Sequence, residues 1–237
     1  MCGRYSCVGN LDELAKLVAF ISRVPFFAPR YNLAPRQQAP VIVRANGQTE
    51  AKLMRWGLIP SWSKDESIGD KLINARAETL TEKTSFKKPF ASQRCLVPAD
   101  GFYEWQRSEH GGKTPFRFTM KDGGFFCFAG LWEKWIRPPK EQEFLIDDMG
   151  DVPQPSRIVE NFTIITTTAN PMVAAVHDRM PAIIGPEHFG WWLDEDGDGE
   201  FLKGLLTPYP AEDMNCYRVS PLVNNAKNDS PEIVKPA

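Results

Sequence analysis

The sequence predicts an α+β fold: a single domain built on a curved, barrel-like, mainly antiparallel sheet with flanking helices. Two observations favour this class. β-type runs and short helical patterns are interspersed without regular βαβ alternation, and turn signals separate neighbouring runs. In addition, a chain of 237 residues that is 42% hydrophobic and 24% charged can bury one sizeable core. We therefore expect one domain over residues 1–237, without internal repeats.

The first part of the chain predicts a helix, a loop and a hairpin. Residues Asn10–Ile21 carry an apolar helical period behind an asparagine that suits the N-cap. Arg30–Pro40 has several prolines and no helical period, so we expect a loop there. Val41–Val43 and Ala51–Trp56 indicate two strands, and Asn46-Gly47 between them is a strong hairpin signal.

The later elements are shorter. We expect a second hairpin from Pro115–Met120 and Phe125–Leu131 around a Lys-Asp-Gly-Gly turn at 121–124. Asn161–Thr168 is rich in β-branched residues and predicts a buried strand. Helices are expected near Pro171–Val176 and at Pro186–Leu193, whose proline suits the first helical turn.

Two polar stretches are expected at the surface. Residues Arg137–Glu160 contain prolines and acidic residues without a sustained period, which indicates a long surface loop at about 137–160. Strand-like sequence resumes on both sides, so we do not expect a domain linker. Asp194–Gly199 fits the first half of a calcium-binding loop, but Leu205 stands where the closing glutamate belongs. An acidic turn is therefore favoured, and no metal site is expected.

Composition limits the compartment and the partners. The five cysteines are widely spaced and form no CxxC pair, which argues against a disulfide framework or zinc site and favours a reducing cytoplasm. No apolar run approaches the roughly 20 residues of a membrane span, and no signal-peptide pattern is present. The net charge of −2 does not favour bulk polyanion binding, so any nucleic-acid contact requires a local basic surface.

Cys2 is the first candidate for chemistry. It directly follows Met1, and a small residue at this position allows methionine aminopeptidase to expose it as the N-terminus. An N-terminal cysteine carries an α-amine and a thiol on adjacent carbons, with pKa values near ~8 and ~8.5. The pair can condense with an aldehyde to an imine and close a thiazolidine ring, or the thiol can attack with the amine as its base. The alternative is an ordinary small residue near a chain end.

Three further candidates lie in segments that combine polar residues with turn formers and aromatics, at 73–79, 99–105 and 176–181. They are Asn74, Glu104 and His177, and each taken alone could be structural. His177 is favoured among the three histidines because it ends a short helix-like run and precedes Asp-Arg, which can present an imidazole to a cleft.

Together these motifs resemble the SOS-response-associated peptidase family, the SRAP-domain or abasic site processing proteins. The matching stretches are MCGRY at 1–5, YNLAP at 31–35, RWGLIPSW at 55–62, INARAET at 73–79, RCLVPADGFYEW at 94–105 and HDRMP at 177–181. The likeness continues into the C-terminal VNNAKNDSPEIVKP and so covers essentially the whole chain. The clearest departures, at 137–160 and 194–200, touch none of these motifs.

The resemblance implies an SRAP-like fold and covalent capture of abasic sites in single-stranded DNA through Cys2, after Met1 removal, to shield the lesion. It implies that Cys2 is the nucleophile and that Asn74, Glu104 and His177 form its catalytic surroundings. The ring-opened abasic sugar exposes an aldehyde, and closure of the thiazolidine is intramolecular, for which effective molarities reach ~10⁵ M. Glu104 and His177 would carry the proton transfers, and Asn74 would hold the geometry without titrating. No cofactor is expected.

DNA binding would then depend on local residues. Three arginines inside the motifs, Arg4, Arg76 and Arg179, are candidates for pairing with phosphates around one groove. Candidates for stacking on or wedging against bases are Trp62, Trp105, Leu33 and Pro35. We expect Trp56 in the core and Trp62 at the surface, while Trp105 fits either position.

Two other functions remain open. One is a Cys2-dependent peptidase that uses His177 and Glu104, with an activity that can be confined to removal of Met1. The other is a single-stranded nucleic-acid binding module in which Cys2 is incidental. A blocked α-amine would abolish covalent capture, whereas a thiol-only peptidase or a binding module would tolerate it. We expect a cytoplasmic monomer, nucleoid-associated when it acts on DNA, whose partner is single-stranded DNA with abasic sites and not a membrane. Replication or repair proteins that recruit it are not identifiable from the sequence.

Overall fold

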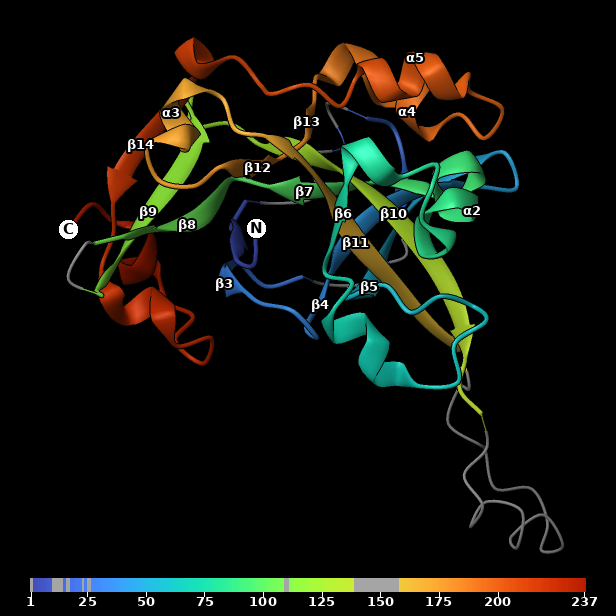
Figure 1. The fold of residues 1–237 in the computed structure, drawn as a ribbon, viewed down its shortest axis with the longest axis horizontal. Helices are drawn as coiled ribbons and strands as arrows, with labels where there is room; N and C mark the ends of the chain where they lie inside the picture. Colours follow the sequence, from blue (N-terminus) through green and yellow to red (C-terminus); the bar gives the residue numbers. More distant parts are fainter. Residues whose placement is uncertain are drawn as a thin grey trace, which may run out of the picture.

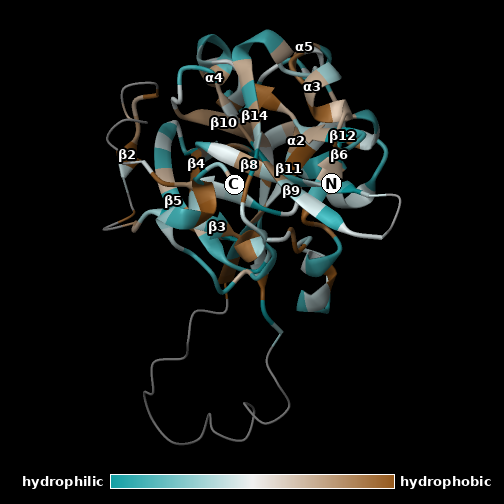
Figure 2. Cartoon of the chain, turned by 90° about the vertical axis from the view of Figure 1, so that its left-hand side faces the viewer, coloured by the Kyte–Doolittle hydropathy of each residue, from teal (hydrophilic) through white to brown (hydrophobic). Residues whose placement is uncertain are grey.

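The computed structural model describes residues 2–9, 15, 18–22, 24, 27–108, 111–138 and 158–237. Two sheets lie side by side, and the N-terminal end of the chain lies between them (Figure 1). The first, here called the small sheet, has the strand order β14-β9-β8-β1-β3. Its strands are β1 (Tyr5–Cys7), β3 (Arg30–Leu33), β8 (Gly101–Arg107), β9 (Lys113–Met120) and β14 (Met214–Arg218). Figure 2 turns this side toward the viewer, with β8 and β9 in front.

The second sheet closes into a barrel. The ring consists of β4 (Gln38–Ala45), β5 (Gln48–Trp56), β7 (Arg94–Ala99), β10 (Phe126–Ile136) and β11 (Ile158–Thr168). Four neighbouring pairs in the ring are antiparallel, and the closing pair, β11 with β5, is parallel with Phe162 opposite Trp56. Four short strands extend the edges: β2 (Ile21–Ser22), β6 (Asn74–Arg76), β12 (Arg179–Pro181) and β13 (Ile183–Ile184). The predicted α+β class with a curved, mainly antiparallel, barrel-like sheet is confirmed.

Side chains alternate along the barrel strands between two apolar clusters, as the period of two requires. On β4, Val41 and Val43 join the cluster inside the barrel, and Ile42 joins the one outside. The inner cluster continues into the small sheet, where the rings of Tyr5 and Trp56 lie 5.2 Å apart. The outer cluster is covered by α2 (Thr84–Ser92), α4 (Phe189–Leu193) and α5 (Gly199–Gly204) (Figure 1). Trp56 is buried in the core, as predicted.

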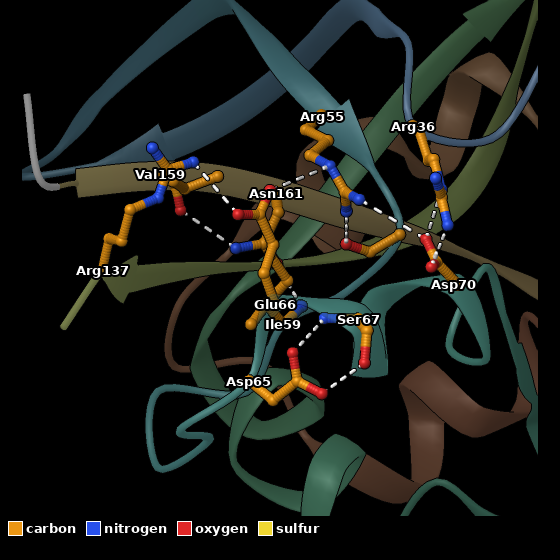
Figure 3. Close-up of polar contacts among 11 residues, drawn as sticks. Arg36, Arg55, Ile59, Asp65, Glu66, Ser67, Asp70, Arg137, Val159 and Asn161 are labelled. Carbon is orange, nitrogen blue, oxygen red and sulfur yellow. Dashed lines mark hydrogen bonds and ion pairs between the residues drawn. The ribbon is translucent and has the colours of Figure 1, made fainter. Parts of the chain in front are cut away.

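A polar network holds the chain after β5 against the barrel (Figure 3). Arg55 Nε lies 3.7 Å from Glu66 Oε1, and Arg55 Nη2 lies 3.5 Å from Asp70 Oδ1, at the two ends of the short helix η1 (Glu66–Asp70). On β11, Asn161 Oδ1 accepts a hydrogen bond of 2.7 Å from the backbone N–H of Ile59. These contacts fasten the segment that follows β5 to β11, where the ring closes.

One predicted hairpin is confirmed and the other is wrong. Asn46 and Gly47 both have positive φ, 52° and 74°, and join β4 to β5 as the Asn-Gly signal indicated. The turn at 121–124 does not join paired strands. β9 pairs with β8 and β14 in the small sheet, whereas β10 pairs with β7 and β11 in the barrel. The turn therefore carries the chain from one sheet to the other.

The expected loop Arg30–Pro40 is also wrong in part, because Arg30–Leu33 form β3 and Gln38 begins β4. Most of the helix expected over 10–21 lies outside the described residues, and its expected end is wrong, since Ile21–Ser22 form β2 beside β5. The helices expected later in the chain are confirmed. They are α3 (Pro171–Ala174) and, after a turn at η4 (Pro186–His188), α4.

The structure describes the two polar stretches, expected at 137–160 and 194–199, to different extents. Residues 139–157 of the expected 137–160 loop lie outside the described residues, and Ile158–Glu160 belong to β11. In the acidic stretch, Asp198 caps α5 by accepting from the backbone N–H of Glu200 at 2.9 Å. In the part of the chain that the structure describes, no helix is long and apolar enough to cross a membrane, and no three His, Cys, Asp or Glu side chains gather as a metal site. All five cysteines are free thiols.

Candidate active site

Glu104 and His177, 73 positions apart in the sequence, line the same cavity, whose volume is about 420 Å³. Glu104 is carried by β8, and His177 follows α3. The remaining lining side chains are Trp105, Arg107, Lys113 and Asn224, the last of which ends the short helix η6 (Pro221–Asn224). Two of the catalytic residues expected from the sequence therefore line the same cavity.

Glu104 is a buried acid, with only 3% of its surface exposed. Burial raises the pKa of Glu104 to about 7, and the nearby carboxylate of Asp178 also acts to raise it. A carboxyl group with this pKa is divided between its neutral and charged forms near neutral pH. Glu104 can therefore both donate and accept a proton in the cavity.

His177 is held in a defined orientation. Its backbone N–H donates to Val173 O at 2.8 Å, which fixes it to the end of α3. Its ring atom Nδ1 lies 3.0 Å from Arg179 N and 2.9 Å from Asp178 Oδ1. Burial lowers the pKa of His177, so the ring is neutral at pH 7. In the neutral ring, Nδ1 accepts from the Arg179 N–H and the hydrogen is on Nε2, whereas Asp178 becomes a partner only when Nδ1 is protonated.

Cys2 lies fully buried in the inner apolar cluster. Its Sγ is 3.8 Å from the carbonyl oxygen of Arg4, a weak S–H contact. Burial raises the pKa of the Cys2 thiol well above its usual value, and the charge of nearby Glu104 raises it further. The thiol is therefore protonated at neutral pH, and no standing thiolate is present.

Asn74 lies on the barrel side of the site. It belongs to β6, pairs in register with Ile164 of β11, and donates from Nδ2 to the carbonyl oxygen of Ile164 at 3.4 Å. Its Oδ1 is buried and accepts no hydrogen bond from the residues that the structure describes. Ile73 and Ile164 pack in the cluster that contains Cys2, so Asn74 is next to that cluster rather than among the side chains lining the cavity.

Arg4, one of the three arginines expected to bind phosphate, is already engaged by the protein. Its Nη1 donates to Asn32 Oδ1 and to Val223 O, both at 2.8 Å. Its guanidinium carbon lies 5.9 Å from the centre of the Trp105 ring. Arg4 therefore anchors the C-terminal segment above Trp105.

The other two arginines, Arg179 and Arg76, differ in whether other residues of the protein bind their guanidinium groups. Arg179 makes a two-pronged ion pair with Glu78, at 2.6 and 2.9 Å, and also donates to Thr166 O at 2.7 Å. Arg76 is exposed and forms no ion pair with any described residue. Both sit beside β11, with Arg76 in register with Thr166 and Arg179 with Thr168. Of the three arginines, Arg76 is the one whose guanidinium makes no hydrogen bond or ion pair with the described residues.

The residues expected to contact bases differ in how far they are exposed to solvent. Trp105 is half-buried, lines the cavity, and donates from Nε1 to Asn224 Oδ1 at 2.7 Å. Trp62 is 59% exposed, as expected for the surface. Leu33 is only 1% exposed and packs in the inner cluster, so its expected contact with bases is wrong. The adjoining Pro35 is partly exposed.

Sequence reasoning missed three of the side chains that line the cavity: Arg107, Lys113 and Asn224. Arg107 is two residues beyond Trp105 on β8, and this period of two is a signal that could have found it. Lys113 requires the β8–β9 register, which places it opposite Arg107. Asn224 lies in the C-terminal motif at 223–236, but nothing in the local sequence brings it to Trp105.

Comparisons with known proteins identify relatives over almost the whole chain. A family model described as SOS response associated peptidase (SRAP) matches residues 1–226. The abasic site processing protein YoqW of Bacillus subtilis (strain 168) is 42% identical over 238 residues, covering 99% of both chains. The abasic site processing protein HMCES of Rattus norvegicus is 34% identical over 275 residues, covering 100% of this chain and 76% of its own. An X-ray structure of a Bacteroides thetaiotaomicron protein is similar with a TM-score of 0.83 at 29% identity, covering 100% of both chains.

Proposed function

Because the chain belongs to the SOS response associated peptidase (SRAP) family, we propose that it processes abasic sites in single-stranded DNA by capturing them covalently through Cys2. The observation that carries this proposal is the cavity in which Glu104, an acid with a pKa of about 7, meets His177 close to the buried Cys2. The names of the curated relatives favour an abasic site as the substrate.

The first step uses the α-amine of Cys2, which is free once Met1 is removed. The amine attacks the C1′ aldehyde of the ring-opened sugar and gives a carbinolamine. The neutral carboxyl of Glu104 then protonates the departing hydroxyl, and loss of water leaves a protonated imine and the Glu104 carboxylate. An acid with a pKa near the working pH suits this transfer because much of it carries the proton at pH 7.

The second step uses the thiol. The Cys2 sulfur adds to the imine carbon, its proton passes to the Glu104 carboxylate, which regenerates the acid, and a five-membered thiazolidine with a neutral nitrogen forms. The raised pKa of the thiol supports this order, because the thiol stays protonated until the imine is in place. Ring closure is intramolecular and gains a large effective molarity.

His177 and Asn74 assist without changing charge. The neutral His177 ring offers its Nε2–H to an oxygen of the sugar, while Arg179 fixes the other ring nitrogen. Asn74 brings an amide whose buried oxygen makes no hydrogen bond with the described residues, and which can accept one from the N-terminus or the sugar.

The Cys2-dependent peptidase is the weaker alternative. Attack on an external peptide bond needs a thiolate that reaches solvent. The Cys2 thiol is fully buried and burial raises its pKa, so a thiol-first reaction is disfavoured at neutral pH. An amine-first reaction does not have this requirement.

An intact-mass measurement tests the proposal. Met1-processed protein is mixed with a single-stranded oligonucleotide that carries one abasic site. We expect a species equal to protein plus DNA minus one water, which survives denaturant without a reducing agent. Cys2→Ser should give no such species, whereas the matched control Cys216→Ser should give it in full, since Cys216 lies on β14 away from the cavity lining. Absence of the adduct when the Cys2 amine is confirmed to be free would overturn covalent capture.

A further inference from the structure

Two cations lie side by side at the cavity, and the described residues provide neither with a counterion. Arg107 of β8 and Lys113 of β9 are directly opposite each other in the antiparallel ladder, and both line the cavity. Directly opposed side chains point to the same face of a sheet, and like charges in this arrangement destabilise it. Both residues are exposed, and neither forms an ion pair with any residue in the described part of the chain.

An aromatic ring lies on the same face. Trp105 precedes Arg107 by two residues on β8, so the two side chains share a side of the strand. Its indole is held at its edge by the Nε1 hydrogen bond to Asn224 at 2.7 Å and is in contact over the ring with the Arg4 guanidinium. The face therefore combines a stacking platform with two cations, next to Glu104 and His177.

The arginines expected from the motifs do not serve this side of the cavity. The guanidinium groups of Arg4 and Arg179 donate hydrogen bonds to other residues of the protein, and Arg76 lies on β6 beside the barrel. The cavity nevertheless has to receive a polyanion under the proposed function. Among the described lining residues of β8 and β9, only Arg107 and Lys113 provide positive charge.

We propose that Arg107 and Lys113 form a phosphate clamp for the nucleotide that flanks the abasic site on the Trp105 side, with the base of that nucleotide stacked on Trp105. The inference rests on the proposed function and deepens it, because it assigns a flanking phosphodiester as part of the recognised substrate. Arginine and lysine both bind phosphate by charge-assisted hydrogen bonds, and stacking on an aromatic ring is tolerant of base identity. The clamp accordingly predicts that the protein recognises the phosphate and base of the flanking nucleotide without preferring any particular base.

The test measures binding rather than chemistry. The probe is a single-stranded oligonucleotide with one tetrahydrofuran abasic analogue, which has no aldehyde, and its affinity is followed by fluorescence anisotropy from low to high salt. In the double variant Arg107→Ala/Lys113→Ala we expect the slope of log affinity against log salt to fall by about 0.7, since the clamp neutralises one phosphate and each neutralised phosphate of a single strand contributes about 0.7. A matched control, Lys87→Ala/Lys88→Ala, removes two exposed charges from α2 and should leave the slope unchanged.

A neutral methylphosphonate beside the analogue locates the contact. It should reduce the salt slope for the wild type and cause little further loss in the double variant, because the two changes remove the same interaction. The double variant should be at least as resistant to urea as the wild type, since it relieves a like-charge pair. An unchanged salt slope, or wild-type protein that does not bind the analogue, overturns the clamp. Failure to form a mass adduct while the slope change persists overturns only the covalent proposal.

Discussion

At the scale of single residues, Glu104 combines reactivity with a cost to stability. Its pKa rises from 4.5 to about 7 on folding because burial disfavours the carboxylate. The folded protein thus binds this proton more tightly than the unfolded chain does. The stabilising contribution is complete below pH 4.5, falls as the pH rises to about 7, and stays low above that value.

Glu104→Gln separates these two effects, since the amide keeps the shape of the neutral acid. Relative to the wild type, we expect the free energy of unfolding to rise by about 3 kcal/mol at pH 8 and to change little at pH 4, because each pKa unit corresponds to ~1.4 kcal/mol. The rate of adduct formation should fall by ~10² or more, as for the loss of a general acid. Urea unfolding at both pH values and adduct mass against time measure the two effects. Equal changes in unfolding free energy at pH 4 and pH 8 would contradict the raised pKa.

Individual residues were predictable where a motif fixed them and not where a remote partner decided their role. The motifs led to Glu104 and His177, and the structure brings both to one cavity. Arg179 lies in a motif as well, but its charge is taken by Glu78, 101 residues away. Leu33 fails for a similar reason, because the pairing of β3 with β1 turns its side chain into the inner cluster.

At the scale of elements, Arg94 fastens two helices to the barrel. Its Nη1 donates to Phe90 O and Ala91 O at the end of α2, at 2.7 and 2.6 Å, and its Nε donates to Trp192 O of α4 at 2.9 Å. The last carbonyls of a helix have no partner within the helix and attract cations. Arg94 is only 4% exposed, so water cannot replace it.

Arg94→Ala should therefore destabilise the fold. Three carbonyls, two of them in buried hydrogen bonds, lose their donor, and we expect the free energy of unfolding to fall by about 3 kcal/mol or more. Urea unfolding gives the value, and Lys88→Ala, an exposed residue of α2, should change it by no more than about 0.5 kcal/mol. If the two variants unfold alike, the helices do not depend on this guanidinium.

Elements were predictable where local chemistry determines them. Asn46-Gly47 adopts the positive φ values that make a tight hairpin, and the strands on both sides pair as expected. The turn at 121–124 also reverses the chain, but turn chemistry does not choose the strand partner, and β10 pairs with β7 instead. The strand Arg30–Leu33 was not predicted because it depends on a distant residue. Asp229, about 200 residues away, accepts hydrogen bonds from the backbone N–H groups of Tyr31 and Asn32.

At the scale of the whole molecule, Asn32 joins both ends of the chain to the small sheet. Its Oδ1 accepts from Arg4, while its Nδ2 donates to the carbonyl oxygens of Val223, Asn225 and Asn228 at 3.3, 3.1 and 2.7 Å. Asn32 is fully buried. The contacts of Asn32 with the C-terminal segment span close to 200 residues, which is why no local pattern could predict that Asn224 reaches the cavity.

The same arrangement makes the cavity depend on Asn32 although the residue does not line it. In Asn32→Ala, three carbonyls of the C-terminal segment and the Arg4 guanidinium lose a partner, so residues 221–228 should detach from Trp105. We expect amide hydrogen exchange in 221–228 to become much faster, the free energy of unfolding to fall by about 2 kcal/mol, and adduct formation to slow. Hydrogen exchange followed by mass spectrometry measures the first effect. Asn215→Ala, an exposed position on β14, is the matched control and should change none of the three. Slower adduct formation without faster hydrogen exchange at 221–228 would contradict this role. The lower rate would then have a cause other than detachment of the C-terminal segment.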